Sequence, residues 1–226
     1  MPNAYTTLWT NDVCRYLRRK GQEGERLVIL FGGPHLSLPS FVRAGVEEGD
    51  HIYPVRAFRK RLWALGRMEV GRILPYDTVG ERTALEDYVR LLRWDGLKAG
   101  GVSEVLLGPP GSPLRFDRPL PPDLLTSLTY TSRRGERRLK HVVDGELRHS
   151  TGVQGIFRLA PESAAAMEAL VAMETSAAME ASEPDRPSPD GVVSGPCEGE
   201  RSKGKPGENR GNHAKGGQPW AGTVSF

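Results

Sequence analysis

The stretch 49–74 is the feature that most constrains what this chain can fold into. After a Gly-Asp turn, β-branched and aromatic residues follow in near alternation up to Val55, as in a strand. Four basic residues then interrupt the apolar pattern within 56–61, and apolar residues return from Leu62 to Ile73. This pattern predicts a two-stranded hairpin with a basic turn.

Short strands and helices surround this hairpin. Thr10, Asn11 and Asp12 are residues that favour the first positions of a helix, and Asp144-Gly145 is a turn signal. Strands are predicted at 5–9, 27–31, 104–107 and 154–159, with a further strand around 139–143. Helices are predicted at 13–19, 39–44, 81–94, 122–128 and 163–180. This mixture of short elements indicates an α+β fold.

The composition changes sharply near residue 183. Beyond it the chain is mostly Pro, Gly, Ser, Glu and Lys, which lowers the overall hydrophobic content to 38%. Such a segment buries too little apolar surface to offset an ordering cost of ~1–2 kcal/mol per residue. We therefore predict one domain at 1–182 and a disordered tail at 183–226. No signal-peptide pattern and no apolar run of membrane length is present, so a cytoplasmic location is expected.

Several motifs together resemble the PUA-like superfamily, in particular its EVE, YTH and ASCH-type small barrels. They are an early strand ending in Trp9 and followed by Asn11, a helix, an apolar strand, the Gly49-Asp50 hairpin and a closing strand with a helix after it. The resemblance spans about residues 5–172. It implies a small curved mixed β-sheet or barrel flanked by helices. It also implies a pocket for RNA or a modified DNA base near Trp9, Thr10 and Asn11.

The aromatic residues allow two interpretations. Trp9, Trp63 and Phe31 are a possible stacking platform for a flipped base, since such stacking contributes ~1–3 kcal/mol per base. Alternatively, each is a core residue of its strand. Trp9 is the best candidate for binding, because Asn11 beside it offers an amide that can pair with a base edge.

Two basic clusters stand at predicted hairpin turns. They contain Arg56, Arg59, Lys60 and Arg61 in the first, and Arg133 and Arg134 in the second. Placed on one face, they would hold the phosphates of a nucleic acid. Alternatively, they are solvated turns that discourage edge-to-edge aggregation. The net charge of +3 does not by itself indicate nucleic-acid binding.

From these features we predict a non-enzymatic module that binds DNA or RNA, with a modified or flipped base as its ligand. The scattered histidines and two cysteines predict no metal site, and no motif predicts a cofactor or a catalytic residue. One alternative is a small hydrolase on the same scaffold, for which Thr10, Lys20 and Glu69 are the residues to test. The other is a protein-interaction module that docks through the terminal helix.

Overall fold

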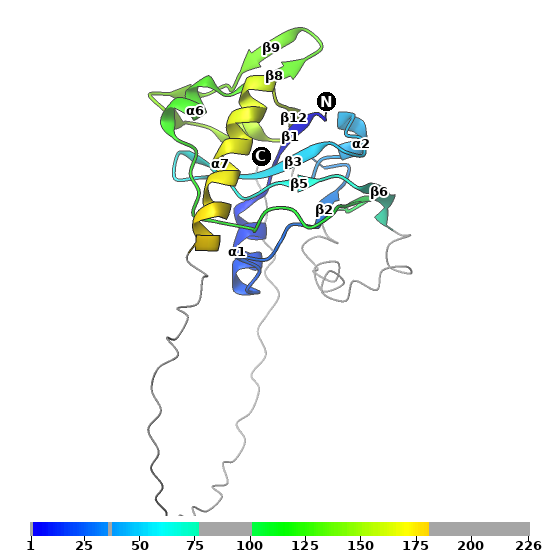
Figure 1. Cartoon of the computed structure of the whole chain (residues 1–226). Helices are drawn as coiled ribbons and strands as arrows, with labels where there is room; N and C mark the ends of the chain where they lie inside the picture. The colour runs from blue at the N-terminus through cyan, green and yellow to red at the C-terminus, as the bar shows by residue number, and fades with distance from the viewer. Residues whose placement is uncertain (1, 36–37, 77–100, 181–226) are drawn as a thin grey trace, which may run out of the picture. The chain divides into compact units, whose positions relative to one another are not determined.

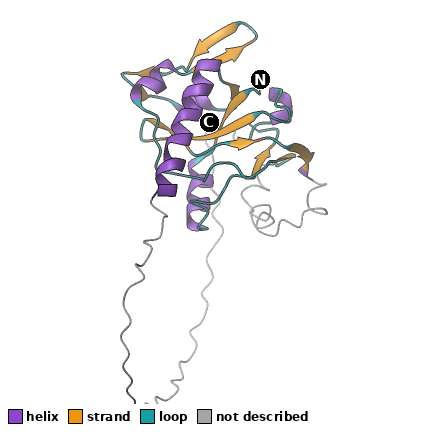
Figure 2. Ribbon diagram, in the orientation of Figure 1, coloured by secondary structure: helices purple, strands orange, loops and turns teal. Residues whose placement is uncertain are grey.

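A computed structural model describes residues 2–35, 38–76 and 101–180 of the chain. The predicted helix 81–94 and the predicted tail 183–226 lie outside the described residues, so both stay predictions. The fold is α+β, as predicted from the sequence (Figures 1 and 2). The described strands form several separate sheets and do not close into a barrel, so the mixed sheet, and not the barrel, is the correct alternative.

The main sheet is built on the parallel pair of β1 and β3. Its path runs β12-β1-β3-β4, and a short β5 pairs with the start of β3. The strands are β1 (Ala4–Leu8), β3 (His51–Phe58), β4 (Arg61–Ala64), β5 (Met68–Glu69) and β12 (Ile156–Arg158). The β3–β4 hairpin confirms the first half of the prediction for 49–74.

The second half of that prediction is wrong, because the return arm is not one strand. β4 ends at Ala64, and β6 (Arg72–Pro75) belongs to a second sheet with the order β2-β7-β6. Its other strands are β2 (Ile29–Gly32) and β7 (Glu104–Leu107). The chain bends at Gly66, which has φ 153° and packs so closely that a Cβ there would lie 2.6 Å from Leu27. After the bend β5 still pairs with β3, and the chain enters the second sheet only after Glu69. Because the apolar pattern continues from β4 to β6, it hides this change of sheet.

Four helices and two small hairpins complete the described fold. The helices are α1 (Asn11–Arg19), α2 (Phe41–Ala44), α6 (Pro122–Ser127) and α7 (Pro161–Glu180), with a 3-10 turn at Ser150–Val153. The hairpins pair β8 (Thr129–Ser132) with β9 (Gly135–Arg138), and β10 (Val142–Val143) with β11 (Glu146–Leu147). Asp144 and Gly145 form the second turn, as predicted, with φ 52° and 71°. The strand predicted around 139–143 is shorter than expected.

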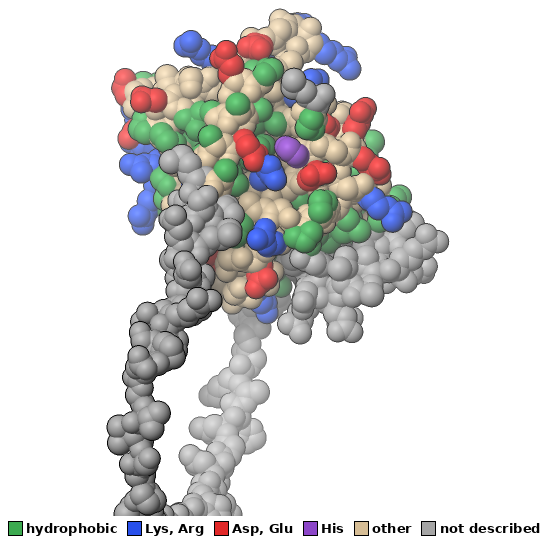
Figure 3. Space-filling model, viewed as in Figure 1, with side chains coloured by type: hydrophobic (Ala, Val, Ile, Leu, Met, Phe, Trp, Pro, Cys, Tyr) green, Lys and Arg blue, Asp and Glu red, His purple; other side chains and the backbone are tan. Residues whose placement is uncertain are grey.

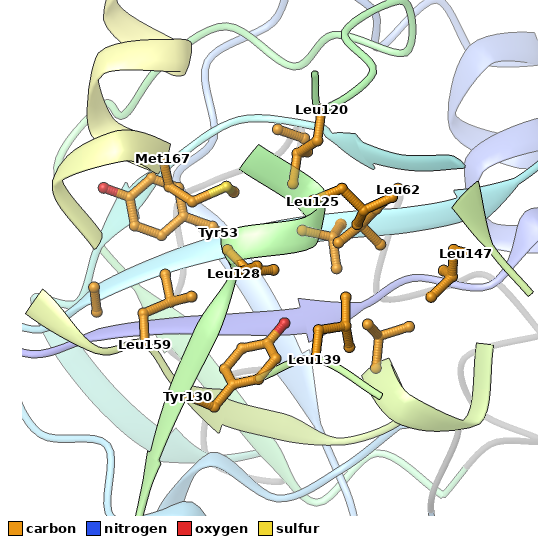
Figure 4. Close-up of a cluster of buried hydrophobic side chains, with 14 of the residues drawn as sticks. Tyr53, Leu62, Leu120, Leu125, Leu128, Tyr130, Leu139, Leu147, Leu159 and Met167 are labelled. Atoms are coloured by element: carbon orange, nitrogen blue, oxygen red, sulfur yellow. The ribbon is translucent and has the colours of Figure 1, made fainter. Parts of the chain in front are cut away.

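The core lies on both sides of the main sheet. On one side Tyr53 and Val55 pack with Met167 of α7 in the cluster shown in Figure 4. On the other side Ile52 packs with Cys14 of α1. Because successive strand residues point to opposite faces, Arg56 and Phe58 project to the same side as Ile52, the side that carries α1. None of the described helices is both long and apolar enough to cross a membrane.

Candidate nucleic-acid interface

Arg56 occupies an unusual place for a cation at the end of β3. It is only 7% exposed, its Nε donates to Asn11 Oδ1 at 2.7 Å, and its guanidinium carbon lies 4.2 Å from the centre of the Phe58 ring. The contact with Asn11 holds one edge of the Arg56 guanidinium group, and the contact with Phe58 holds one of its faces. Neither Nη atom has a hydrogen-bond acceptor among the described residues, and neither is sealed from solvent. The Nη edge is therefore free to bind a ligand.

The segment from Trp9 to Asn11 lies beside Arg56 because β1 runs parallel to β3. The Trp9 N–H donates to the Val55 carbonyl at 2.8 Å, and Asn11 Nδ2 donates to the Ala57 carbonyl at 3.4 Å. Trp9 is half-buried at the end of β1. Thr10 has a structural task, since its hydroxyl accepts from the Val13 N–H and caps α1. The structure thus brings Trp9 and Asn11 together with Arg56, although Asn11 and Arg56 are 45 positions apart in the sequence.

The turn between β3 and β4 adds further positive charge. The Arg59 guanidinium carbon lies 5.1 Å from the centre of the Phe58 ring, so two cations share one aromatic side chain. Arg61 stands across from Phe58 in the hairpin register and is exposed. Lys60 pairs with Glu146 at 3.4 Å, which partly neutralises it. No ion pair involves Arg56, Arg59 or Arg61 among the described residues.

Arg59 and Lys60 also hold a backbone conformation that suits neither residue. Their φ angles are 49° and 59°, the positive values that a two-residue hairpin turn requires. Asn-Gly meets this requirement with little strain, whereas a left-handed conformation costs other residues ~1–2 kcal/mol each. Basic side chains therefore occupy this turn against the local backbone preference.

Helix α1 extends the basic surface away from Arg56. Asn11, Arg15 and Arg18 are spaced four and three residues apart, so they lie along one side of the helix. Arg15 pairs with Asp12, and Arg18 pairs with Glu23 at 3.3 Å. An open hollow of about 540 Å³ is bounded by side chains of this helix, among them Arg15, Arg18 and Arg19.

Cys14 is buried on the side of the main sheet to which Arg56 projects, and it does not supply a counter-charge. Burial raises the pKa of its thiol to about 12, although the charge of Arg56 opposes this shift. The thiol is therefore neutral at physiological pH.

The second basic cluster lies apart from the first. Arg133 and Arg134 form the turn between β8 and β9, and β8 reaches the main sheet through a bridge from Tyr130 to Leu159. The Leu159 N–H donates to the Ala4 carbonyl, where β1 begins, whereas the turn 59–60 follows the end of the parallel β3. The structure therefore places the two turns toward opposite ends of the sheet and does not gather them on one binding face.

Of the three aromatic residues of the predicted stacking platform, Phe31 is separated from the other two, whereas Trp9 and Trp63 both pack against the cluster that contains Ile52. Phe31 belongs to the second sheet and packs in a different cluster. Trp63 lies across from Arg56 in the hairpin, and its indole N–H donates to the Phe58 carbonyl at 3.1 Å. Phe58, which was not among the aromatic candidates selected from the sequence, is the ring that contacts both Arg56 and Arg59.

The residues of the hydrolase alternative are not assembled into a site. Thr10 and Lys20 lie at opposite ends of α1, and the Lys20 ammonium stands 5.7 Å from the Tyr16 ring. Glu69 lies opposite His51 where β5 pairs with the start of β3, away from Thr10. Among the described residues no group of three potential metal ligands comes together.

A polar cluster on α7 escaped sequence analysis. The Tyr53 hydroxyl donates to Glu168 Oε2 at 2.6 Å, and Arg67 Nη1 donates to Glu168 Oε1 at 2.5 Å. Burial alone would raise the pKa of Glu168, but the hydrogen bonds from Tyr53 and Arg67 hold it below its usual range. Through these two hydrogen bonds, Glu168 links α7 to Tyr53 of β3 and to Arg67. Acidic and basic side chains are interspersed on the face that carries α7 (Figure 3).

Comparison with known proteins finds similarity in structure only. No family model and no curated protein matches the chain. Two crystal structures of single-residue mutants of ZmASCH from Zymomonas mobilis are similar to it at 12% identity. The first has a TM-score of 0.39 and covers 76% of this chain and 100% of that one, and the second has a TM-score of 0.36 and covers 75% and 99%. Likeness at this level assigns no activity to this chain.

Proposed function

We propose that the chain is a nucleic-acid binding module of the PUA-like kind, and that it binds through the end of β3 and the start of α1. The observation that carries the proposal is the pair Arg56 and Arg59, which share the Phe58 ring and have no carboxylate partner in the described structure. Phosphate groups are ligands that such unpaired guanidinium groups bind strongly, through parallel N–H···O hydrogen bonds.

Neighbouring side chains favour a nucleic acid over an isolated phosphate ion. Trp9 is half-buried beside Arg56 and offers an apolar face on which an unstacked base can rest. Arg15 and Arg18 continue the basic surface along α1. A base next to a row of phosphates is the pattern of a single strand, so we propose a single-stranded ligand. A flipped or modified base would be held against Trp9.

Fluorescence anisotropy with oligonucleotides, single- and double-stranded, with and without modified bases, tests this function. The wild-type chain should bind single strands with an affinity that falls as salt rises, and Arg59→Ala with Arg61→Ala should lower both the affinity and the salt slope. On single strands each lost phosphate contact reduces that slope by about 0.7. The charge-matched control, Arg133→Ala with Arg134→Ala, should bind nearly as wild type. Absence of oligonucleotide binding at low salt would refute the proposal.

A further inference from the structure

The environment of Arg56 lacks a negative charge. The residue is 7% exposed, the buried Cys14 on the same side of the sheet is a neutral thiol, and no described carboxylate pairs with Arg56 or with Arg59. Burying a charge costs free energy unless an opposite charge or a full set of hydrogen bonds compensates. Only Nε has such a bond here, to Asn11. The site therefore becomes electrostatically complete when an anion binds the Nη edge.

The start of α1 supplies further donors at the same place. Val13 donates to the Thr10 hydroxyl, whereas the backbone N–H groups of Asn11 and Asp12 have no acceptor among the described residues. The first turn of a nine-residue helix also carries a partial positive charge, which favours anions. The Asp12 carboxylate opposes an anion there, but its ion pair with Arg15 offsets its charge.

We propose that this site binds the terminal phosphate of a nucleic-acid strand, an inference that rests on the proposed function and deepens it. A phosphodiester within a strand carries one charge, whereas a terminal monoester carries about −1.5 to −2 and has three acceptor oxygens. Two guanidinium groups around one ring match the larger charge. The Nη edge and two backbone N–H groups match three oxygens.

Access to the site also favours a strand end. A monoester has one substituent and can enter end-on, whereas an internal phosphodiester must bring two sugars toward a guanidinium on a residue that is 7% exposed. In this arrangement the first base lies toward Trp9, and the following phosphates lie toward Arg15 and Arg18.

Matched oligonucleotides test the inference. One sequence is prepared with a 5′-phosphate, a 3′-phosphate or hydroxyl groups at both ends, labelled on an internal base, and titrated into the full chain at fixed ionic strength. One of the two phosphorylated ends should bind about tenfold tighter than the hydroxyl form. Arg56→Lys keeps the charge but loses the planar fork, so it should reduce this advantage to about twofold or less. Arg133→Lys is the matched control and should retain it.

The outcomes separate the two proposals. If none of the three oligonucleotides binds, the proposed function fails. If all three bind equally, the function stands and the inference is overturned. The inference is also overturned if the advantage survives in Arg56→Lys, or if a nucleoside monophosphate binds as tightly as the phosphorylated strand.

Discussion

The two basic hairpin turns of this chain resemble each other in sequence and differ in surroundings. At the turn 59–60, basic residues adopt positive φ angles and lie against an aromatic ring and the first residue of α1. At the turn 133–134, positive φ falls on Gly135, and Ser132 organises the backbone by accepting from the Arg134 N–H and donating to the Gly135 carbonyl. No aromatic ring contacts Arg133 or Arg134 in the described structure.

This difference shows that the number of basic residues does not identify a binding site. Exposed arginines at a relaxed turn cost the fold little and are explained by solubility and by the need to protect a strand edge. A buried arginine without a counter-charge, next to a strained basic turn, costs free energy that the fold alone does not recover. Binding is the simplest physical reason for such a cost, and three variants test the comparison.

The largest effect is expected for Arg56→Met. Methionine keeps the length and the apolar contact with Phe58 but removes the charge and the Nη donors, so affinity for a single-stranded oligonucleotide should fall about 30-fold or more. Because the variant also removes an unpaired buried charge, the free energy of unfolding should stay the same or rise by about 1 kcal/mol. Anisotropy and thermal unfolding measure the two quantities. Loss of binding together with a marked loss of stability would instead indicate a structural role for Arg56.

Trp9→Leu should have the second-largest effect. Leucine preserves the apolar contact with the core but removes the flat face, so affinity should fall by about tenfold, which corresponds to one lost stacking contact. The slope of affinity against salt should not change, because no phosphate contact is lost. Trp63→Leu is the matched control, because the Trp63 indole N–H donates to the Phe58 carbonyl in the wild-type chain. This variant should bind more nearly as wild type. Equal losses in the two variants would contradict the assignment of Trp9.

Local sequence patterns predict the β3–β4 hairpin, the Thr10 cap and the Asp144-Gly145 turn, because each depends on neighbouring residues. Asn11 and Arg56 could also be selected as candidates from the sequence. Their contact could not be predicted, because it depends on β1 pairing parallel to β3 across a long connection.

The dependence of the fold on contacts distant in sequence also explains the predictions that were wrong. The bend at Gly66 interrupts the return arm, β5 still pairs with β3, and the chain enters the second sheet only after Glu69, without a break in the apolar pattern. The placement of the two basic turns toward opposite ends of the sheet depends on the bridge from Tyr130 to Leu159, a contact distant in sequence. Local patterns therefore identify turns and caps, whereas the composition of a binding face depends on the order and direction of strands.

The smallest effect on binding is expected when the strained turn is relaxed by Arg59→Asn with Lys60→Gly. These residues accept the φ angles of 49° and 59°, so the free energy of unfolding should rise by about 1 kcal/mol. Affinity should fall only a few-fold, because Arg56 and its contact with Asn11 remain. The backbone bond from the Leu147 N–H to the Lys60 carbonyl is also preserved. Arg133→Asn with Arg134→Asn removes the same charge at the relaxed turn and should change neither quantity appreciably. A gain in stability without loss of affinity would show that the turn 59–60 carries its basic residues for a reason other than binding.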